Sequence, residues 1–237
     1  MQKNSHTTSI FHYTRNIDNL LSILRHGLKY SYCYEEYFGV YIALPMVSFC
    51  DIPISRSSEQ CSKYGIYAIG LSKDFINTTM DRFFGPVIYL RENQVKNLPE
   101  NISDIYGFIK PFESEIIRKR FGKKTKKHQI HYDECEWRSI IPENTILQNG
   151  ETCKWYHSKD EYEEWRKQTK SKFIDYDTIQ FKVTDISFIL VHHQNSIPNI
   201  IKKIKSLKSI GGVKATIEQK DILISKIISF EQIKRDF

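Results

Sequence analysis

Glycine and proline are scarce, with 10 and 7 residues among 237. This composition excludes collagen-like and linker-dominated chains, which need both residues in far larger numbers. Long apolar runs are also missing: a stretch such as Ile186–Val191 is far short of the ~20 residues that span a bilayer. The first residues lack the apolar stretch of a signal peptide. We therefore expect a cytoplasmic protein that does not bind membranes.

Cysteine is used sparingly and in no recognisable pattern. The five cysteines form an odd set without a C-x-x-C pair, which argues against a disulfide framework and against a zinc ribbon. His192 and His193 lack a third ligand at metal-site spacing. We expect free, buried thiols and no metal.

Several motifs that define common enzyme classes are absent as well. The chain has no G-x-x-x-x-G-K-[ST] or G-x-G-x-x-G loop for phosphate, and no G-x-S-x-G elbow. The H-x-E and P-C-x-x-C pair of zinc deaminases is missing too. These absences leave the remaining polar clusters as the candidates for function.

The chain does contain the material of a packed and basic globular protein. Apolar residues make up 40% of it and aromatic residues 13%, enough for a sizeable core. The 35 Lys and Arg residues exceed the 28 Asp and Glu residues, which gives a formal charge of +7. This excess hints at an acidic partner.

Hydrophobic spacing in the first part of the chain predicts alternating short strands and helices. A strand is expected at 9–14 and a helix at 16–27, followed by an apolar strand at 47–53 that a proline ends. Short apolar stretches at 66–71 and 86–90 are typical of strands.

The second part continues this mixed pattern. We expect a helix at 113–121, a strand at 136–141 and a helix opened by a capping box at Ser158. The expected C-terminal elements are strands at 179–183, 188–192 and 214–218, a helix at 198–207 and a last helix begun by Ser229. This order predicts a single α+β domain over residues 1–237, with mixed or antiparallel central sheets and flanking helices.

Two glutamates at the start of the strand predicted near 136–141 form one candidate site. Glu134 and Glu136 stand two apart, so on a strand they share one face. Neighbouring carboxylates are costly unless they serve a cation, a metal or a proton transfer. The structural alternative is a solvated strand face with a surface salt bridge to Arg138 or Lys154.

A second candidate lies on the first predicted strand. His12 and Thr14 share one face there, while Phe11 and Tyr13 face the core. An imidazole and a hydroxyl so placed can hydrogen-bond a ribose or a pyrophosphate. The alternative is a structural histidine at the end of a strand.

The stretch from Arg118 to Lys127 carries seven basic residues among ten. Such a run stays solvated and binds phosphate backbones independently of sequence. The alternative is an exposed loop that serves solubility alone. The basic residues are Arg118, Lys119, Arg120, Lys123, Lys124, Lys126 and Lys127.

The opening motif resembles that of DarT-like ADP-ribosyltransferases. The resemblance is carried by Phe11-His12-Tyr13-Thr14, then by Asn19-Leu20 and Ile23-Leu24 ahead of Gly27. It implies an ADP-ribosyltransferase-like fold with its core in residues 1–150, and a C-terminal helix plus βαβ-like extension over 151–237. It also implies NAD as a substrate and no metal.

Other segments are similar to the AbiGi family of abortive phage-resistance proteins. They lie at 47–55, 63–73, 86–89 and 134–138, within about the first two thirds of the chain. This resemblance implies a role in phage defence. The family name is also attached to an antitoxin opposite a nucleotidyltransferase-like toxin.

The transferase resemblance assigns roles to particular residues. It implies that Glu136 holds a ribose hydroxyl and stabilises an oxocarbenium-like state, and that Glu134 acts on the acceptor. It implies that His12 and Thr14 contact NAD. Tyr64 is a candidate to stack on nicotinamide, or else it is a core aromatic.

Three hypotheses follow for function. The first is an NAD-dependent ADP-ribosyltransferase of phage defence that modifies RNA, DNA or a protein. The second is a non-catalytic antitoxin or immunity component that binds a partner toxin. The third is a plain nucleic-acid-binding protein that uses the basic run.

Overall fold

The computed structural model describes residues 7–78, 83–97, 103–120, 123–169, 171, 173–174 and 178–236. The chain forms two compact units that interleave along the sequence. Unit 1 comprises residues 1–29, 48–81 and 176–237, and unit 2 comprises residues 30–47 and 82–175. Neither unit begins or ends at residue 150, and the single domain expected from the sequence stays a prediction.

Unit 1 is built on a mixed sheet with the strand order β14-β11-β4-β1 and the end of β3 beside β1. β11 and β14 run parallel, and β1 pairs antiparallel with both β4 and β3. Its strands are β1 (Ser9–Thr14), β4 (Tyr67–Ser72), β11 (Ile186–Val191), β14 (Ile227–Ser229), the last residues of β3 (Val40–Cys50), and the small hairpin β12 (Ser209–Ile210) and β13 (Val213–Lys214).

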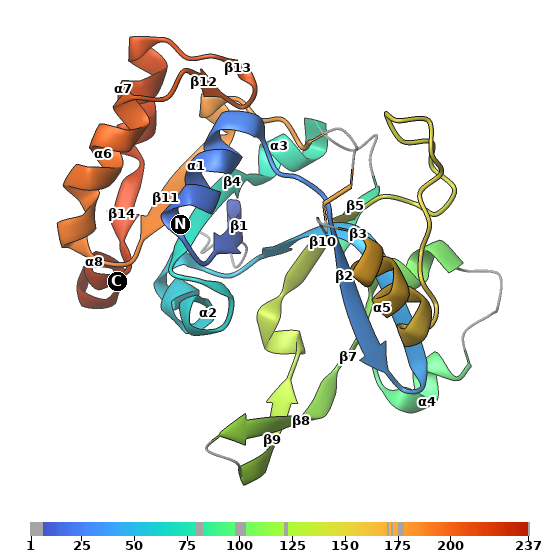
Figure 1. Cartoon of the computed structure of the whole chain (residues 1–237). Coiled ribbons are helices and arrows are strands. Elements are labelled where there is room, and N and C mark those ends of the chain that lie inside the picture. Colours follow the sequence, from blue (N-terminus) through green and yellow to red (C-terminus); the bar gives the residue numbers. More distant parts are fainter. Residues whose placement is uncertain are drawn as a thin grey trace. The chain divides into compact units, whose positions relative to one another are not determined.

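Helices accompany this sheet, and Figure 1 shows α6 beside α7 in the C-terminal part of the unit. The α-helices are α1 (Ile17–His26), α2 (Ser57–Tyr64), α3 (Lys73–Thr78), α6 (Ile197–Lys205), α7 (Ile217–Ser225) and α8 (Phe230–Asp236), and the 3-10 turns are η1 (Ile54–Arg56), η4 (Val183–Asp185) and η5 (Gln194–Ser196).

The caps of α1 follow directly from its sequence. The Asn16 side chain accepts a hydrogen bond from the Asn19 amide, and Gly27 ends the helix at φ +83°. Leu20, Leu21 and Leu24 are buried at helical spacing. The predicted strand at 9–14 and the predicted helix at 16–27 are confirmed.

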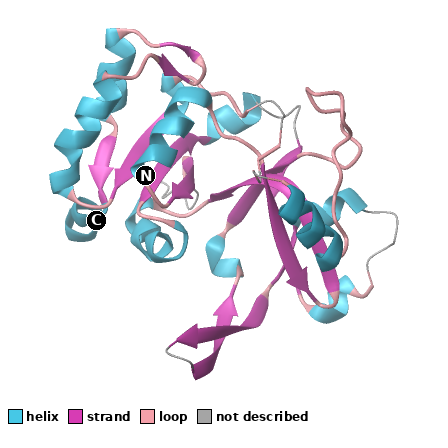
Figure 2. Cartoon of the chain, viewed as in Figure 1, coloured by secondary structure: helices cyan, strands magenta, loops and turns pink. Residues whose placement is uncertain are grey.

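Unit 2 contains the strand order β2-β3-β10-β5, together with two separate strand pairs, β6-β7 and β8-β9. Figure 2 shows the strands of each pair in magenta. The strands are β2 (Ser31–Tyr37), residues 40–47 of β3, β5 (Phe83–Pro86), β6 (Ile88–Leu90), β7 (Ile109–Pro111), β8 (Glu113–Arg120), β9 (Lys123–Ile130) and β10 (Glu136–Ile140).

The helices of unit 2 are short apart from α5. They are α4 (Glu92–Val95), α5 (Lys159–Gln168), η2 (Ser103–Phe108) and η3 (Tyr132–Glu134). Ser158 caps α5 as predicted, because its hydroxyl accepts from the Glu161 amide. Tyr162 of this helix packs against Tyr32 and Tyr156, with Trp165 beside them.

Some sequence predictions were wrong, and the largest error is the helix at 113–121. Residues 113–120 form β8, which pairs with β9 in an antiparallel hairpin. The segment is rich in Glu, Lys and Arg, which favour helices locally. Strand pairing outweighs that weak preference here.

Three other expected strands also differ from those in the structure. β3 begins at Val40 rather than 47 and contains Pro45, whose carbonyl still accepts from the Ile141 amide. The expected strand at 179–183 is reduced to one bridge between Ile179 and Leu28. The expected strand at 214–218 is mostly wrong, because Thr216 and Gln219 form a capping box that starts α7.

Within the described residues, none of the helices is both long and apolar enough to cross a membrane. Two of the five cysteines, Cys50 and Cys153, are buried as expected, whereas Cys33, Cys61 and Cys135 are half-buried.

Candidate functional site

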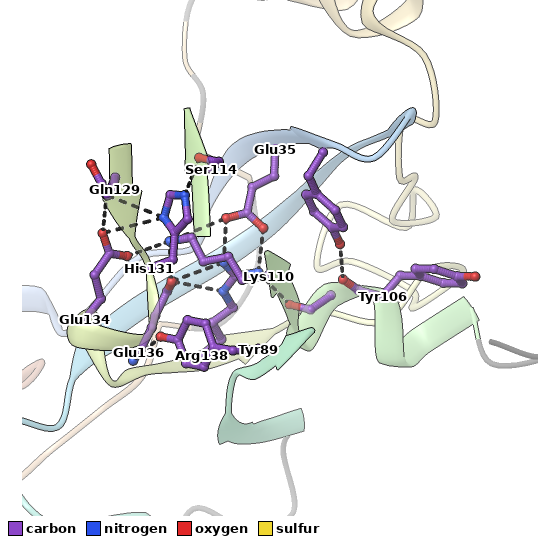
Figure 3. A network of polar contacts seen from close by, with 12 residues as sticks. Glu35, Tyr89, Tyr106, Lys110, Ser114, Gln129, His131, Glu134, Glu136 and Arg138 are labelled. Carbon is purple, nitrogen blue, oxygen red and sulfur yellow. Dashed lines mark hydrogen bonds and ion pairs between the residues drawn. The ribbon is translucent and has the colours of Figure 1, made fainter. Parts of the chain in front are cut away.

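A buried network of charged side chains in unit 2 surrounds Lys110 (Figure 3). The Lys110 Nζ atom donates to Glu134 Oε2 at 2.7 Å and to Glu136 Oε2 at 2.8 Å. Glu35 Oε1 lies 3.8 Å from the same nitrogen. One ammonium group therefore gathers three carboxylates.

Arg138 ties two of these carboxylates together from the other side. Its Nη1 and Nη2 atoms donate to the two oxygens of Glu35 at 2.8 and 2.6 Å. Its Nε and Nη2 atoms donate to Glu136 at 2.9 and 3.2 Å. The guanidinium is therefore bidentate toward each carboxylate, which is the geometry in which arginine binds carboxylates most strongly.

The backbone of Gly107 completes the arginine site. Its carbonyl accepts from Arg138 Nη1 at 2.9 Å. A Cβ atom at Gly107 would lie 2.8 Å from Ile140 Cδ1, so a larger residue there requires the Ile140 side chain to shift. Arg138 is only 1% exposed, and its guanidinium donates five hydrogen bonds to Glu35, Glu136 and Gly107.

Four separate elements supply these side chains. β2 carries Glu35, β7 carries Lys110, η3 carries Glu134, and β10 carries both Glu136 and Arg138. Glu136 and Arg138 are two residues apart and share one face of their strand.

The backbone at Cys135 brings the two glutamates to the same lysine. Glu134 lies in a 3-10 turn and not in the strand, so strand alternation does not explain its position. Cys135 has φ 43° and ψ 51°, the left-handed conformation, which turns the chain from η3 into β10. The predicted neighbourhood of Glu134 and Glu136 is confirmed, and the predicted reason for it was wrong.

A polar layer connects Glu134 to the hairpin of β8 and β9. Gln129 Nε2 donates to Glu134 Oε1 at 2.9 Å, and Ser114 Oγ lies 2.7 Å from His131 Nε2. His131 Nδ1 is 4.0 Å from Glu134 Oε1. Ser114 and Gln129 are directly opposite each other in the hairpin, so the network holds both strands at one end.

The charges of the network perturb its ionisation. Burial alone raises the pKa of Glu136, but Arg138 and Lys110 outweigh it and hold that pKa well below its usual range. Burial likewise lowers the pKa of Lys110, but the carboxylates, with Glu136 foremost, leave it above its usual value. Burial also raises the pKa of Tyr89, whose hydroxyl accepts from the Glu136 amide at 2.8 Å. Glu136 and Lys110 therefore stay ionised near neutral pH.

The burial of the two glutamates tests one of their two interpretations, the solvated strand face with a surface salt bridge. Glu134 is 2% exposed and Glu136 is 7% exposed, so the expected solvated strand face is wrong. The expected pairing with Arg138 is confirmed, but the pair is buried and not at the surface. Their catalytic role stays a prediction.

His12, Thr14 and Tyr64 belong to unit 1. His12 Nδ1 lies 2.9 Å from the Ser48 carbonyl oxygen, and its ring meets the edge of Phe49. Thr14 is buried at the end of β1, and Phe11 and Tyr13 are buried as expected. Tyr64 ends α2 and is 37% exposed. Their contact with NAD stays a prediction.

The basic run lies on β8 and β9 and not in a loop. Of its seven basic side chains, Lys126 belongs to the described part, and it pairs with Glu115 at 2.8 Å on an exposed strand. The other six side chains lie outside the described ones. Their assignment to nucleic-acid binding therefore rests on sequence and backbone alone.

Lys110 and Glu35 are the residues that the sequence analysis missed. Lys110 stands alone between Ile109 and Pro111, and a single cation in an apolar stretch is a signal of a buried ion pair. Glu35 stands among tyrosines of β2 and carries no comparable local signal. Among the described residues, no group of His, Cys, Asp and Glu is arranged to hold a metal ion.

Comparison with known proteins assigns the chain to a family. A family model described as "Putative abortive phage resistance protein AbiGi, antitoxin" matches residues 39–98 and 77–192, which is more than half of the chain. The chain belongs to the AbiGi family. Lys110, Glu134, Glu136 and Arg138 all lie inside the part that matches AbiGi.

A curated relative supports the same assignment to AbiGi. The chain is 28% identical over 234 residues to "Abortive phage resistance protein AbiGi" of Lactococcus lactis subsp. cremoris, covering 82% of this chain and 89% of that protein. No solved structure matches the chain. The expected AbiGi membership is confirmed, and the likeness to DarT-like transferases stays a prediction.

Proposed function

We propose that this chain is the antitoxin of an abortive-infection pair and that it acts by binding a partner toxin. One observation carries the proposal: all four carboxylate oxygens of Glu134 and Glu136 accept hydrogen bonds from side chains of the same unit. A ribose hydroxyl or an acceptor nucleophile has to displace one of these charge-assisted bonds to reach either carboxylate. The family description, which includes the word antitoxin, supports the same role.

NAD-dependent ADP-ribosyl transfer is the second candidate function. It is favoured by the depressed pKa of Glu136, which the buried Arg138 and Lys110 hold below its usual range against the effect of burial. A carboxylate that stabilises an oxocarbenium-like state must be ionised, and Glu136 meets that requirement. The two candidate functions therefore assign different roles to the same network. In the antitoxin it supports the fold, and in the transferase it is the reaction site.

Expression in a host without a related system separates the two functions. The antitoxin proposal expects no growth arrest from this chain alone, and expects the chain to relieve arrest by a growth-inhibiting gene cloned from its flanking DNA. It also expects no transfer of label from NAD to RNA, DNA or lysate protein.

The matched variants are Glu136→Gln in the network and Glu36→Gln, an exposed carboxylate on β2 of the same unit. Growth arrest by the chain alone, together with label transfer, overturns the antitoxin proposal if Glu136→Gln abolishes both and Glu36→Gln abolishes neither. Failure of every flanking gene to cause an arrest that the chain relieves also overturns it.

A further inference from the structure

The excess positive charge of the chain is concentrated in one short run of residues, 118–127. The run 118–127 contains seven basic residues and no acidic residue. Removing these seven from the 35 Lys and Arg residues leaves 28, which equals the number of Asp and Glu residues. The rest of the chain is formally neutral, and the +7 charge belongs to the run 118–127 within the hairpin of β8 and β9, whose own net charge is +5 because it also contains Glu113 and Glu115.

The register of the hairpin places like charges opposite one another. Lys119 pairs with Lys124 and Arg120 pairs with Lys123 across the strands. Like charges at directly opposite positions destabilise a strand pair. Acidic residues occur in β8 only toward its first residues, at Glu113 and Glu115. The far end of the hairpin therefore has basic residues at directly opposite register positions.

The opposite end of the hairpin is anchored. Ser114 and Gln129, a directly opposed pair, contact His131 and Glu134 of the buried network. The Phe112 carbonyl also accepts from the His131 amide at 2.9 Å. Figure 1 shows β8 and β9 leading away from β7 and β2 of the same unit. The basic end is thus carried on a fixed base.

We propose that the hairpin of β8 and β9 binds duplex DNA as a two-stranded ribbon lying in the major groove. The groove of B-DNA is about 12 Å wide and admits a ribbon of this kind, whereas the major groove of an RNA helix is too narrow for side chains to enter. Eight residues per strand give a ribbon of about 26 Å.

The charge density favours DNA over an acidic protein. Duplex DNA carries about one negative charge per 1.7 Å of axis. A ten-residue run with seven cations and no acidic residue matches that uniform charge. Protein surfaces intersperse charges of both signs. The binding is electrostatic and independent of base sequence, and it does not rest on the proposed antitoxin function.

Fluorescence anisotropy of the full chain with a labelled DNA duplex tests this proposal. The duplex has about 16 base pairs, roughly twice the number that a 26 Å ribbon spans at 3.4 Å per base pair. Seven phosphate contacts predict a slope of about −6 for log K against log salt, which is a loss of roughly 10³–10⁴-fold in affinity between 50 and 200 mM salt.

Two variants that each remove four positive charges give the decisive comparison. The hairpin variant replaces with Gln the four residues nearest the turn: Lys119, Arg120, Lys123 and Lys124. The control variant replaces with Gln four exposed residues of unit 1: Lys202, Lys205, Lys208 and Lys214. We expect the hairpin variant to flatten the slope to about −3, so that the same salt change costs about 40-fold, and the control to keep the wild-type slope.

Other outcomes overturn the proposal. An unchanged slope in the hairpin variant, or equal losses in both variants, assigns the effect to solubility or to net charge. If polyglutamate displaces the duplex as readily as unlabelled duplex does, the partner is an acidic protein. If single-stranded RNA binds more tightly than duplex DNA, binding in the major groove is contradicted. Unchanged tryptophan emission shows that the hairpin variant is folded.

Discussion

Arg138→Met removes the guanidinium that joins Glu35 to Glu136 and leaves an unbranched apolar side chain in the same buried position. In the wild type, three carboxylates face Lys110 and Arg138, so the network has a formal charge of −1. The variant raises that imbalance to −2. Removing one partner of a buried ion pair costs about 3–5 kcal/mol.

That loss is measurable in unit 2 specifically. The three tryptophans, Trp137, Trp155 and Trp165, all lie in this unit, so their fluorescence reports its unfolding. A loss of about 3–5 kcal/mol lowers the melting temperature of the fluorescence transition by roughly 6–20 °C for a chain of this size. Urea unfolding followed by the same signal gives the free energy directly.

Two further variants make the result interpretable. Arg91→Met removes an arginine that is 62% exposed and pairs with Glu113 at 3.2 Å, and it should cost less than about 1 kcal/mol. The double variant Arg138→Met and Glu136→Gln restores the formal charge of −1, so its loss should be smaller than the sum of the single losses by about 0.5–3 kcal/mol. Strict additivity, or an Arg138→Met loss no larger than that of Arg91→Met, refutes the picture of a coupled buried network.

The remaining predictions concern pH and the backbone. The pKa of Glu136 is lowered in the fold, so the ionised Glu136 adds to the free energy of unfolding. This contribution is fully present above the ordinary pKa of 4.5 and is lost as the pH falls below that value. Glu136→Gln should flatten this acid limb in urea titrations at several pH values. The pKa of Lys110 is raised, so its contribution is present below 10.5 and is lost as the pH rises above it, and Lys110→Met should flatten the alkaline limb. Cys135→Val should cost about 1–3 kcal/mol and Cys135→Gly much less, because a branched residue is strained at φ 43°; equal costs would contradict this.

Local signals made the start of the chain predictable. Asn16, Gly27 and the leucines between them define α1 without any knowledge of the tertiary fold, and α1 forms where they indicate. The segment from Glu113 to Arg120 shows the opposite case. Its composition suits a helix, but its structure is decided by pairing with β9, which composition does not encode.

The buried network was half predictable for a related reason. Glu134, Glu136 and Arg138 are close in sequence, so their interaction is visible in a short motif. Lys110 is 24 residues from Glu134, and Glu35 is 103 residues from Arg138. The partners that turn two neighbouring glutamates into a paired and buried network come from other strands, and only the fold shows them.

Charge is handled in two contrasting ways within unit 2. In the network, each carboxylate oxygen of Glu134 and Glu136 accepts a hydrogen bond from a side chain of the same unit. In the hairpin, basic residues occupy directly opposite register positions at its far end. A partner gains most where charge is left unneutralised, because it adds attraction and relieves repulsion there. Ser114 and Gln129 join the two regions. The network is therefore best understood as the base that holds the hairpin, and the proposed DNA binding uses the hairpin itself.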